Sequence, residues 1–346
     1  MQTVKRACVA VTLGFLASSA CAQTQDKEMF SGKTVTIIAG SGSGGGVDLY
    51  ARLIGRHLQK YIPGKPTVIV QNMPGAGSLA AAHHLYSVAP KDGTTIAVVP
   101  APALFDPLMA GEDLGKYDPR KFNYLGNANA DTLVCVVRKD APVQTYKDLF
   151  DKELVVGGTG PGSALWYYPT MERFVLGVKF KVISGYKGSN ELSLALQRNE
   201  IQGVCGIFWS SARQQYPGLM QPGSDFKVIV QHDARTIPAL KEAGVPLSVD
   251  FARTSQQREA LEAFLLQGSI SRPFILPPDV APDRLAAMRK ALADVLKDPE
   301  LLAEARKSGL DISPETGEEV TAQVKKIYGT SPEILAYLRK GAEASK

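Results

Sequence analysis

The sequence lacks the features that mark several large classes of protein. Only four of its 346 residues are cysteine, too few for a small protein held together by disulfides. No five basic residues follow one another, and the net charge is only +5, so a nucleic-acid partner is not expected. GxSxG, Walker A and HExxH motifs are absent, which removes the common hydrolase, nucleotide and zinc-protease signatures. The composition is otherwise that of an ordinary globular protein, and the length of the chain suggests two domains.

The N-terminus has the three parts of an export signal. Lys5 and Arg6 form a positive region, residues 7–17 form a short apolar region, and Ala20-Cys21-Ala22 supplies small residues at a cleavage site. The apolar region is too short to span a bilayer. Lipidation at Cys21 is disfavoured because Ser18 stands where a large aliphatic residue is expected. We therefore predict that residues 1–22 are a signal peptide, cleaved after Ala22, and that the mature protein lies in the periplasm.

Short apolar strands and amphipathic helices alternate along the rest of the chain. Strands are predicted at 35–39, 67–70 and 94–99, separated by a helix at 47–61 and a second helix ending at Val88. This order predicts parallel strands with right-handed crossovers, so the loops before the helices gather at one sheet edge. The pattern repeats with strands at 132–137, 154–156, 180–183 and 204–208. A strand at 226–230 is predicted to return to the first unit, and the remainder is mostly helical.

The repeated pattern predicts two α/β lobes with a ligand cleft between them, each lobe a mostly parallel sheet flanked by helices. After the signal peptide, residues 23–130 and 231–346 are expected to form the first lobe. Residues 131–230 are expected to form the second lobe.

Four loops in this pattern share one design, in which a strand ends, glycines bend the chain and a helix or turn begins. They are residues 40–45, 72–78, 157–163 and 185–189. Glycine lets the backbone approach a ligand and adopt positive φ. Free N–H groups at a helix N-terminus, where the helix dipole is positive, form an anion site. One such loop would be more simply a turn, but four on facing edges favour a small anionic ligand, most simply a carboxylate.

The predicted ligand-binding residues belong to these loops and to the helix after the first of them. They are Ser43, Gly44, Gly45, Asp48, Gly75, Ala76, Gly77, Ser78, Thr159, Gly162, Ser163, Tyr186, Gly188 and Ser189. For Asp48, helix capping or balancing of the helix dipole is preferred to a role as general base. No catalytic residue, metal ligand or cofactor is predicted.

Other chemistries have weaker support in the residues. Gly40 to Gly45 match GxGxxG, but the next strand ends in Gln71-Asn72, without the acid that holds a ribose in a dinucleotide fold. The histidines, His57, His83, His84 and His232, favour solvated or capping roles over metal binding or catalysis. Cys135 and Cys205 remain after cleavage, and a disulfide between them is slightly favoured over two buried thiols.

The loops also resemble those of a known family. Gly44-Gly45-Gly46-Val47-Asp48 with Ala51-Arg52, then Asn72-x-Pro74-Gly75-Ala76-Gly77, then Ala89-Pro90-x-Asp92-Gly93 are similar to the solute receptors of tripartite tricarboxylate transporters, or Bug receptors. Residues 159–163 and 186–189 resemble that family's second-lobe loops. Two departures are the proline-free first loop and the loop after the third strand, Pro100-Ala101-Pro102-Ala103, which lacks hydroxyl side chains.

The resemblance implies a two-lobed periplasmic binding protein of type II that closes over a carboxylate held by backbone amides and bound water. We accordingly expect a monomeric, non-enzymatic receptor. It would deliver a di- or tricarboxylate or an aromatic acid to the membrane components of a tripartite tricarboxylate-type transporter. One alternative is a sensor that presents its ligand to a membrane kinase. An exported enzyme acting on a carboxylate is less favoured because the sequence shows no paired nucleophile and base. A dinucleotide-binding oxidoreductase is less favoured because no acid follows the second strand.

Overall fold

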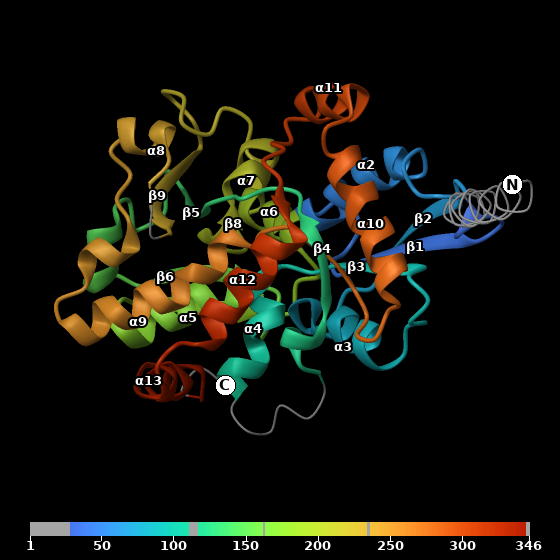
Figure 1. Ribbon diagram of the computed structural model, residues 1–346. Coiled ribbons are helices and arrows are strands. Elements are labelled where there is room, and N and C mark those ends of the chain that lie inside the picture. Colours follow the sequence, from blue (N-terminus) through green and yellow to red (C-terminus); the bar gives the residue numbers. More distant parts are fainter. Residues whose placement is uncertain (1–27, 111–116, 162, 234–235, 344–346) are drawn as a thin grey trace, which may run out of the picture.

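The computed structural model describes residues 28–110, 117–161, 163–233 and 236–343. Within them, the chain forms two β-sheets with helices packed around them (Figure 1). The predicted α/β fold with two sheet-containing halves is confirmed. The signal peptide and its cleavage site after Ala22 lie outside the described residues, as does Gly162.

The first sheet has the strand order β11-β4-β10-β3-β1-β2. Its strands are β1 (Thr34–Ala39), β2 (Thr67–Asn72), β3 (Thr95–Val98), β4 (Asn123–Asn127), β10 (Pro273–Leu276) and β11 (Glu315–Thr316). The strands β1, β2 and β3 are parallel, as predicted. However, β10 runs antiparallel to both β3 and β4, so the sheet is mixed and not mostly parallel. The reason is that β10 re-enters this sheet from the second half of the molecule, without a βαβ crossover.

The second sheet has the strand order β7-β6-β8-β5-β9. Its strands are β5 (Leu133–Arg138), β6 (Leu154–Gly158), β7 (Phe180–Ser184), β8 (Gly203–Phe208) and β9 (Phe226–His232). β6 is parallel to β7 and β8, whereas β5 is antiparallel to both β8 and β9. The prediction that residues 226–230 return to the first unit is wrong, since β9 pairs with β5 from Arg138 to Leu133.

Helices connect the strands and cover both sheets. They are α2 (Gly46–Leu58), α3 (Leu79–Ser87), α4 (Ala101–Ala110), α5 (Ala164–Leu176), α6 (Ser189–Gln197), α7 (Trp209–Gln215), α8 (Pro238–Glu242), α9 (Ser255–Leu265), α10 (Pro282–Val295), α11 (Pro299–Lys307), α12 (Gly317–Tyr328) and α13 (Pro332–Glu343). Short 3₁₀ turns are η1 (Ala76–Ser78), η2 (Pro119–Lys121), η3 (Tyr146–Phe150), η4 (Ser248–Phe251) and η5 (Leu266–Ser269). Among the described residues, no helix has the length and apolar character needed to cross a membrane.

The segment predicted as a loop at 100–103 instead begins helix α4. Pro102 lies in its first turn, where a missing N–H removes no helical hydrogen bond. Leu104 and Phe105 follow, and both are fully buried in the core. Apolar packing therefore outweighs the local signal of the prolines.

The chain crosses between the sheets at 128–132, after β4, and again at 266–272, before β10. The elements that follow residue 230 divide between the two halves. Helices α10 and α12 pack on β4 of the first sheet, whereas α9 and α13 pack on α5 beside the second sheet. Helix α13 also contacts α4, and Figure 1 shows the four helices α4, α5, α9 and α13 gathered at the same end of the molecule.

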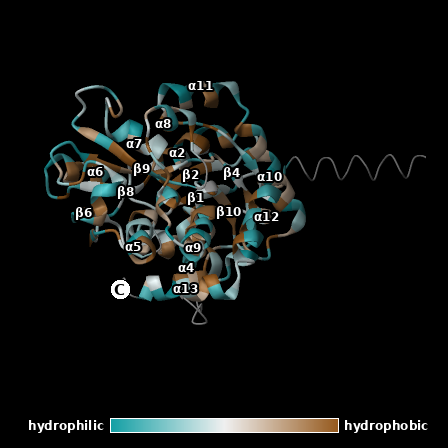
Figure 2. Ribbon diagram, turned by 90° about the vertical axis from the view of Figure 1, so that its left-hand side faces the viewer, coloured by the Kyte–Doolittle hydropathy of each residue, from teal (hydrophilic) through white to brown (hydrophobic). Residues whose placement is uncertain are grey.

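The core lies on the strands and the inward faces of the helices. Every residue of β3 and β8 is buried. Figure 2 shows predominantly hydrophobic strands at the centre, with helices of alternating character around them. Cys135 of β5 lies opposite Cys205 of β8, and a disulfide joins the two fully buried residues.

Candidate ligand-binding site

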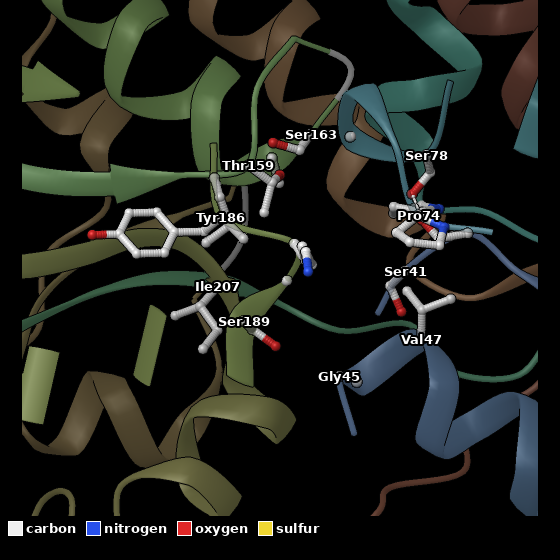
Figure 3. A pocket seen from close by; sticks show the side chains of 18 of the residues that line it. Ser41, Gly45, Val47, Pro74, Ser78, Thr159, Ser163, Tyr186, Ser189 and Ile207 are labelled. Atoms are coloured by element: carbon white, nitrogen blue, oxygen red, sulfur yellow. Dashed lines mark hydrogen bonds between the residues drawn. The ribbon is translucent and has the colours of Figure 1, made fainter. Parts of the chain in front are cut away.

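A cavity of about 340 Å³ lies where the four glycine-rich loops meet. This volume is near the lower end of the range for small-molecule sites. Figure 3 shows two facing groups of residues, one from each half of the molecule. Ser41, Gly45, Val47, Pro74 and Ser78 form one group, and Thr159, Ser163, Tyr186, Ser189 and Ile207 form the other. The cavity is thus built by both sheets.

Most of the predicted ligand-binding residues line this cavity. The ten that do are Gly45, Gly75, Ala76, Gly77, Ser78, Thr159, Ser163, Tyr186, Gly188 and Ser189. Ser43, Gly44 and Asp48 are not among its lining residues. Tyr186 contributes mainly backbone, because its ring extends away from the opposite group in Figure 3.

Four helices begin at the cavity without a side-chain cap. These are α2, α3, α5 and α6, and their N-cap residues, all lining the cavity, are Gly45, Ser78, Ser163 and Gly188. Away from the cavity, Thr254, Asp298 and Thr316 accept backbone N–H groups and so cap α9, α11 and α12. Helices α7, α8 and α10 also begin without a side-chain cap. The N-termini of four helices therefore meet at the cavity, and no N-cap side chain accepts a hydrogen bond from their first N–H groups.

The loop before α3 has an unusual backbone. Gly75, Ala76, Gly77 and Ser78 have successive φ values of 144°, 43°, 64° and 86°. Positive φ is costly for residues other than glycine, and such strain often accompanies binding sites. The Ser78 hydroxyl is used elsewhere, since it donates to the Gly40 carbonyl oxygen at 2.6 Å. No described residue accepts a hydrogen bond from the N–H of Ala76 or Gly77.

The four helix ends differ in how far their positive dipole is already neutralised. In α2, Asp48 accepts a hydrogen bond from the Gly44 N–H at 2.9 Å. Similarly, Glu191 of α6 accepts from the Lys187 N–H at 2.9 Å. The first turns of α3 and α5 contain no acidic residue. The N-termini of α3 and α5 are therefore the most electropositive helix ends at the cavity.

Asp48 connects the first loop to the end of β2. Its side chain, only 2% exposed, pairs with Arg52 at 3.0 Å and accepts from the Asn72 amide at 2.7 Å. Burial alone would raise the pKa of Asp48, but the hydrogen bonds from Arg52, Gly44 and Asn72 together outweigh it and lower the pKa. Of the two roles preferred for Asp48 from the sequence, this geometry fits the balancing of the helix dipole, because Asp48 lies in the first turn of α2 and the helix has no side-chain cap.

The cavity also contains residues that the sequence did not indicate. Arg272 precedes β10 and is fully buried, and Phe208 and Ser211 lie at the start of α7. The Arg272 guanidinium donates to the Ser271 carbonyl at 3.0 Å and to Ser211 Oγ at 3.3 Å. Arg272 is missed because no glycine, spacing or motif near it indicates a site. Only the fold brings it to the four loops.

The two halves of the molecule touch beside the cavity. The Gly42 N–H donates to the Lys187 carbonyl oxygen at 3.4 Å, joining the first loop to the fourth. A Cβ built on Gly46 would overlap with Ser211 Oγ and lie 3.1 Å from the Arg272 guanidinium. The conformation is thus one in which the halves are closed on each other.

The histidines lie outside this cavity. His232 is fully buried and forms a 2.7 Å hydrogen bond with Glu172, and Tyr146 donates to the same carboxylate. The predicted solvated or capping role of His232 is therefore wrong. His57 lies near Asp298 and Glu300, a grouping that could hold a metal ion. There the Lys60 ammonium already contacts both acids, which makes an ion pair sufficient to explain the cluster.

The fold and cavity define a two-lobed solute-binding protein, with a small site enclosed between two α/β halves. The chain belongs to the tripartite tricarboxylate transporter receptor family, TctC, whose model matches residues 51–245. This family consists of binding proteins, so the expectation of a non-enzymatic protein is confirmed.

Known relatives agree with this assignment. A protein from Cupriavidus necator described as "UPF0065 protein in gbd 5'region" is 28% identical over 250 residues, which cover 70% of this chain and 74% of that protein. The periplasmic binding protein BugD has a TM-score of 0.68 at 19% identity, covering 89% of this chain and 97% of its own.

Two solved structures contain carboxylates. MatC from Rhodopseudomonas palustris with bound malate has a TM-score of 0.65 at 18% identity, covering 90% of this chain and 99% of its own. A second R. palustris protein, with adipate, has a TM-score of 0.64 at 18% identity, covering 90% of this chain and 97% of its own. At these identities, the structures establish the shared fold.

Proposed function

We propose that this protein captures a small carboxylate in the periplasm and delivers it to the membrane components of a tripartite tricarboxylate-type transporter. The single observation that carries the proposal is the set of uncapped helix ends at one cavity, above all those of α3 and α5. Such ends attract anions through free N–H groups and the positive dipole. Malate and adipate, seen with two structural neighbours, are ligands of this chemistry.

In this proposal the ligand is held chiefly by backbone. The N–H groups of Ala76 and Gly77 would donate to a carboxylate at the start of α3, and those at the start of α5 would approach from the other half. Each hydrogen bond to a charged group contributes about 1.5–3 kcal/mol. Four to six of them give roughly 6–18 kcal/mol, from which the ordering of ligand and lobes subtracts several kcal/mol. A net value of about −8 kcal/mol corresponds to micromolar affinity, which still permits release.

Calorimetric titration of the mature chain against malate, succinate, adipate, citrate and benzoate tests the proposal. We expect at least one of these acids to bind at micromolar level, with unchanged affinity in excess EDTA. Solution scattering should show a smaller radius of gyration at saturation, because contacts from both halves favour the closed form. Binding that disappears with EDTA and returns with a divalent ion would contradict backbone recognition. No binding by any acid would contradict the proposed function.

A further inference from the structure

Arg272 is a buried cation that no carboxylate contacts directly. Its side chain is fully buried, and among the described residues no carboxylate lies within 4.0 Å of it. Its Nε has no hydrogen-bond partner, and its other hydrogen bonds go to neutral oxygens, those of Ser271 and Ser211. A buried charge is costly unless it is paired, so a guanidinium in a binding cavity that no anion contacts directly requires an explanation.

The surroundings of Arg272 stabilise its charge without neutralising it. The guanidinium carbon lies 3.9 Å from the centre of the Phe208 ring and 5.0 Å from that of Tyr50, both cation–π distances. The acid whose charge acts on it, Asp131, instead accepts hydrogen bonds from the Ser210 N–H and hydroxyl. The stacking leaves the Nε edge of the guanidinium without a partner.

The position of Arg272 makes a ligand the natural source of the missing anion. Arg272, Ser211 and Phe208 all line the cavity that also receives the N-termini of α3 and α5. A guanidinium presents a planar fork of donors that matches a carboxylate, and such pairs are among the strongest hydrogen bonds in proteins. A ligand with a single carboxylate would therefore leave one of these two sources of positive charge, the helix ends or Arg272, without an anion.

We infer that Arg272, supported by Ser211, binds a second carboxylate of the ligand, so that the protein selects dicarboxylates over monocarboxylates. This inference rests on the proposed function, because it assigns the ligand class of the same cavity. One carboxylate is held by the N–H groups at the helix ends, and the other by the guanidinium. A neutral group in place of the second carboxylate leaves the guanidinium without a directly bonded anion.

The test compares each diacid with its monoamide, which has nearly the same shape and one charge fewer. Succinate and succinamate, and adipate and adipamate, are titrated against the wild type, Arg272→Met and Arg213→Met. Arg213 is the matched control, since it also stacks on an aromatic ring, that of Trp209, but pairs with Asp311 on the surface outside the cavity. Unfolding curves of the ligand-free variants show whether each is folded.

We expect the wild type and Arg213→Met to bind the preferred diacid at least about tenfold more tightly than its monoamide. In Arg272→Met, diacid affinity should fall roughly ten- to a hundredfold while monoamide affinity changes little, which removes the preference. A merely structural Arg272 would weaken both ligands alike. Equal binding of diacid and monoamide by the wild type would overturn the inference, even if Arg272→Met does not fold, while leaving carboxylate binding intact. Failure of every acid to bind would overturn the proposed function as well.

Discussion

Gly46 and Ser211 meet across the two halves of the molecule, at a spacing that leaves no room for a side chain on residue 46. A Cβ there would overlap with Ser211 Oγ. Gly46→Ala should therefore hinder closure and lower ligand affinity by roughly tenfold, without unfolding either half. Calorimetric titration and solution scattering with saturating ligand would measure both effects.

Ser211, the other residue of this contact, provides the control. In the double variant Gly46→Ala/Ser211→Ala the overlapping oxygen is gone, and the nearest remaining atom of residue 211 would be Cβ at 3.5 Å. Closure should be at least partly restored, and a double-mutant cycle would quantify the coupling. If Ser211→Ala worsens the effect of Gly46→Ala on closure, the overlap is not its cause.

Gly77 should be intolerant of β-branched side chains for a reason tied to the ligand. Its φ of 64° favours glycine, and it lines the cavity at the start of α3. Gly77→Val should lose a charge-assisted hydrogen bond, about 1.5–3 kcal/mol, and so one to two decades of affinity. Gly244→Val is the control, since Gly244 has a φ of 69° in open space outside the cavity. Equal affinities of the two variants would place the anion site elsewhere.

The disulfide between Cys135 and Cys205 should stabilise the protein without affecting ligand binding. It closes a sequence separation of 70 residues and is buried between β5 and β8, outside the cavity lining. Replacing both cysteines by alanine should lower the free energy of unfolding by about 2–5 kcal/mol. Urea unfolding of the wild type with and without reductant provides the comparison. A reductant effect as large in the double variant as in the wild type would contradict this role.

The stability contributed by Asp48 should depend on pH. Because its pKa is lowered in the folded state, its contribution is complete above the unfolded pKa of about 4 and is lost as pH falls through the folded pKa. Asp48→Asn should thus be less stable than the wild type at pH 7, and the difference should shrink below about pH 4. Urea unfolding of both proteins between pH 7 and pH 3 would show this. A difference that is constant with pH would mean that the charge of Asp48 is not what stabilises the loop.

The parts of the site that could be predicted are those encoded by local sequence. A β-branched run followed by glycines identifies the end of β1 and the start of α2, because both features act on neighbouring residues. The same logic located the loops at 75–78 and 185–189. Arg272 could not be found in this way, since its role depends on residues such as Tyr50 and Ser211 that are distant in the chain.

The fold shows the same division between local and distant causes. β9 was identified correctly as a strand, but its apolar residues fit either sheet, and only pairing with β5 decides between them. In α4 the prolines suggested a loop, whereas the buried Leu104 and Phe105 make a helix favourable. Strand partners and helix packing are set by tertiary contacts, which periodicity does not encode.

Helix α13 packs against elements of both halves of the molecule. It packs on α5 and α9 beside the second sheet and on α4, which follows a strand of the first sheet, and Gly341 approaches Phe174 closely enough to exclude a side chain. The C-terminal helix therefore links the two halves in addition to the crossings at 128–132 and 266–272. A reporter attached to an exposed residue of α13 would accordingly sense the opening of the receptor more directly than one attached to the exposed start of β2.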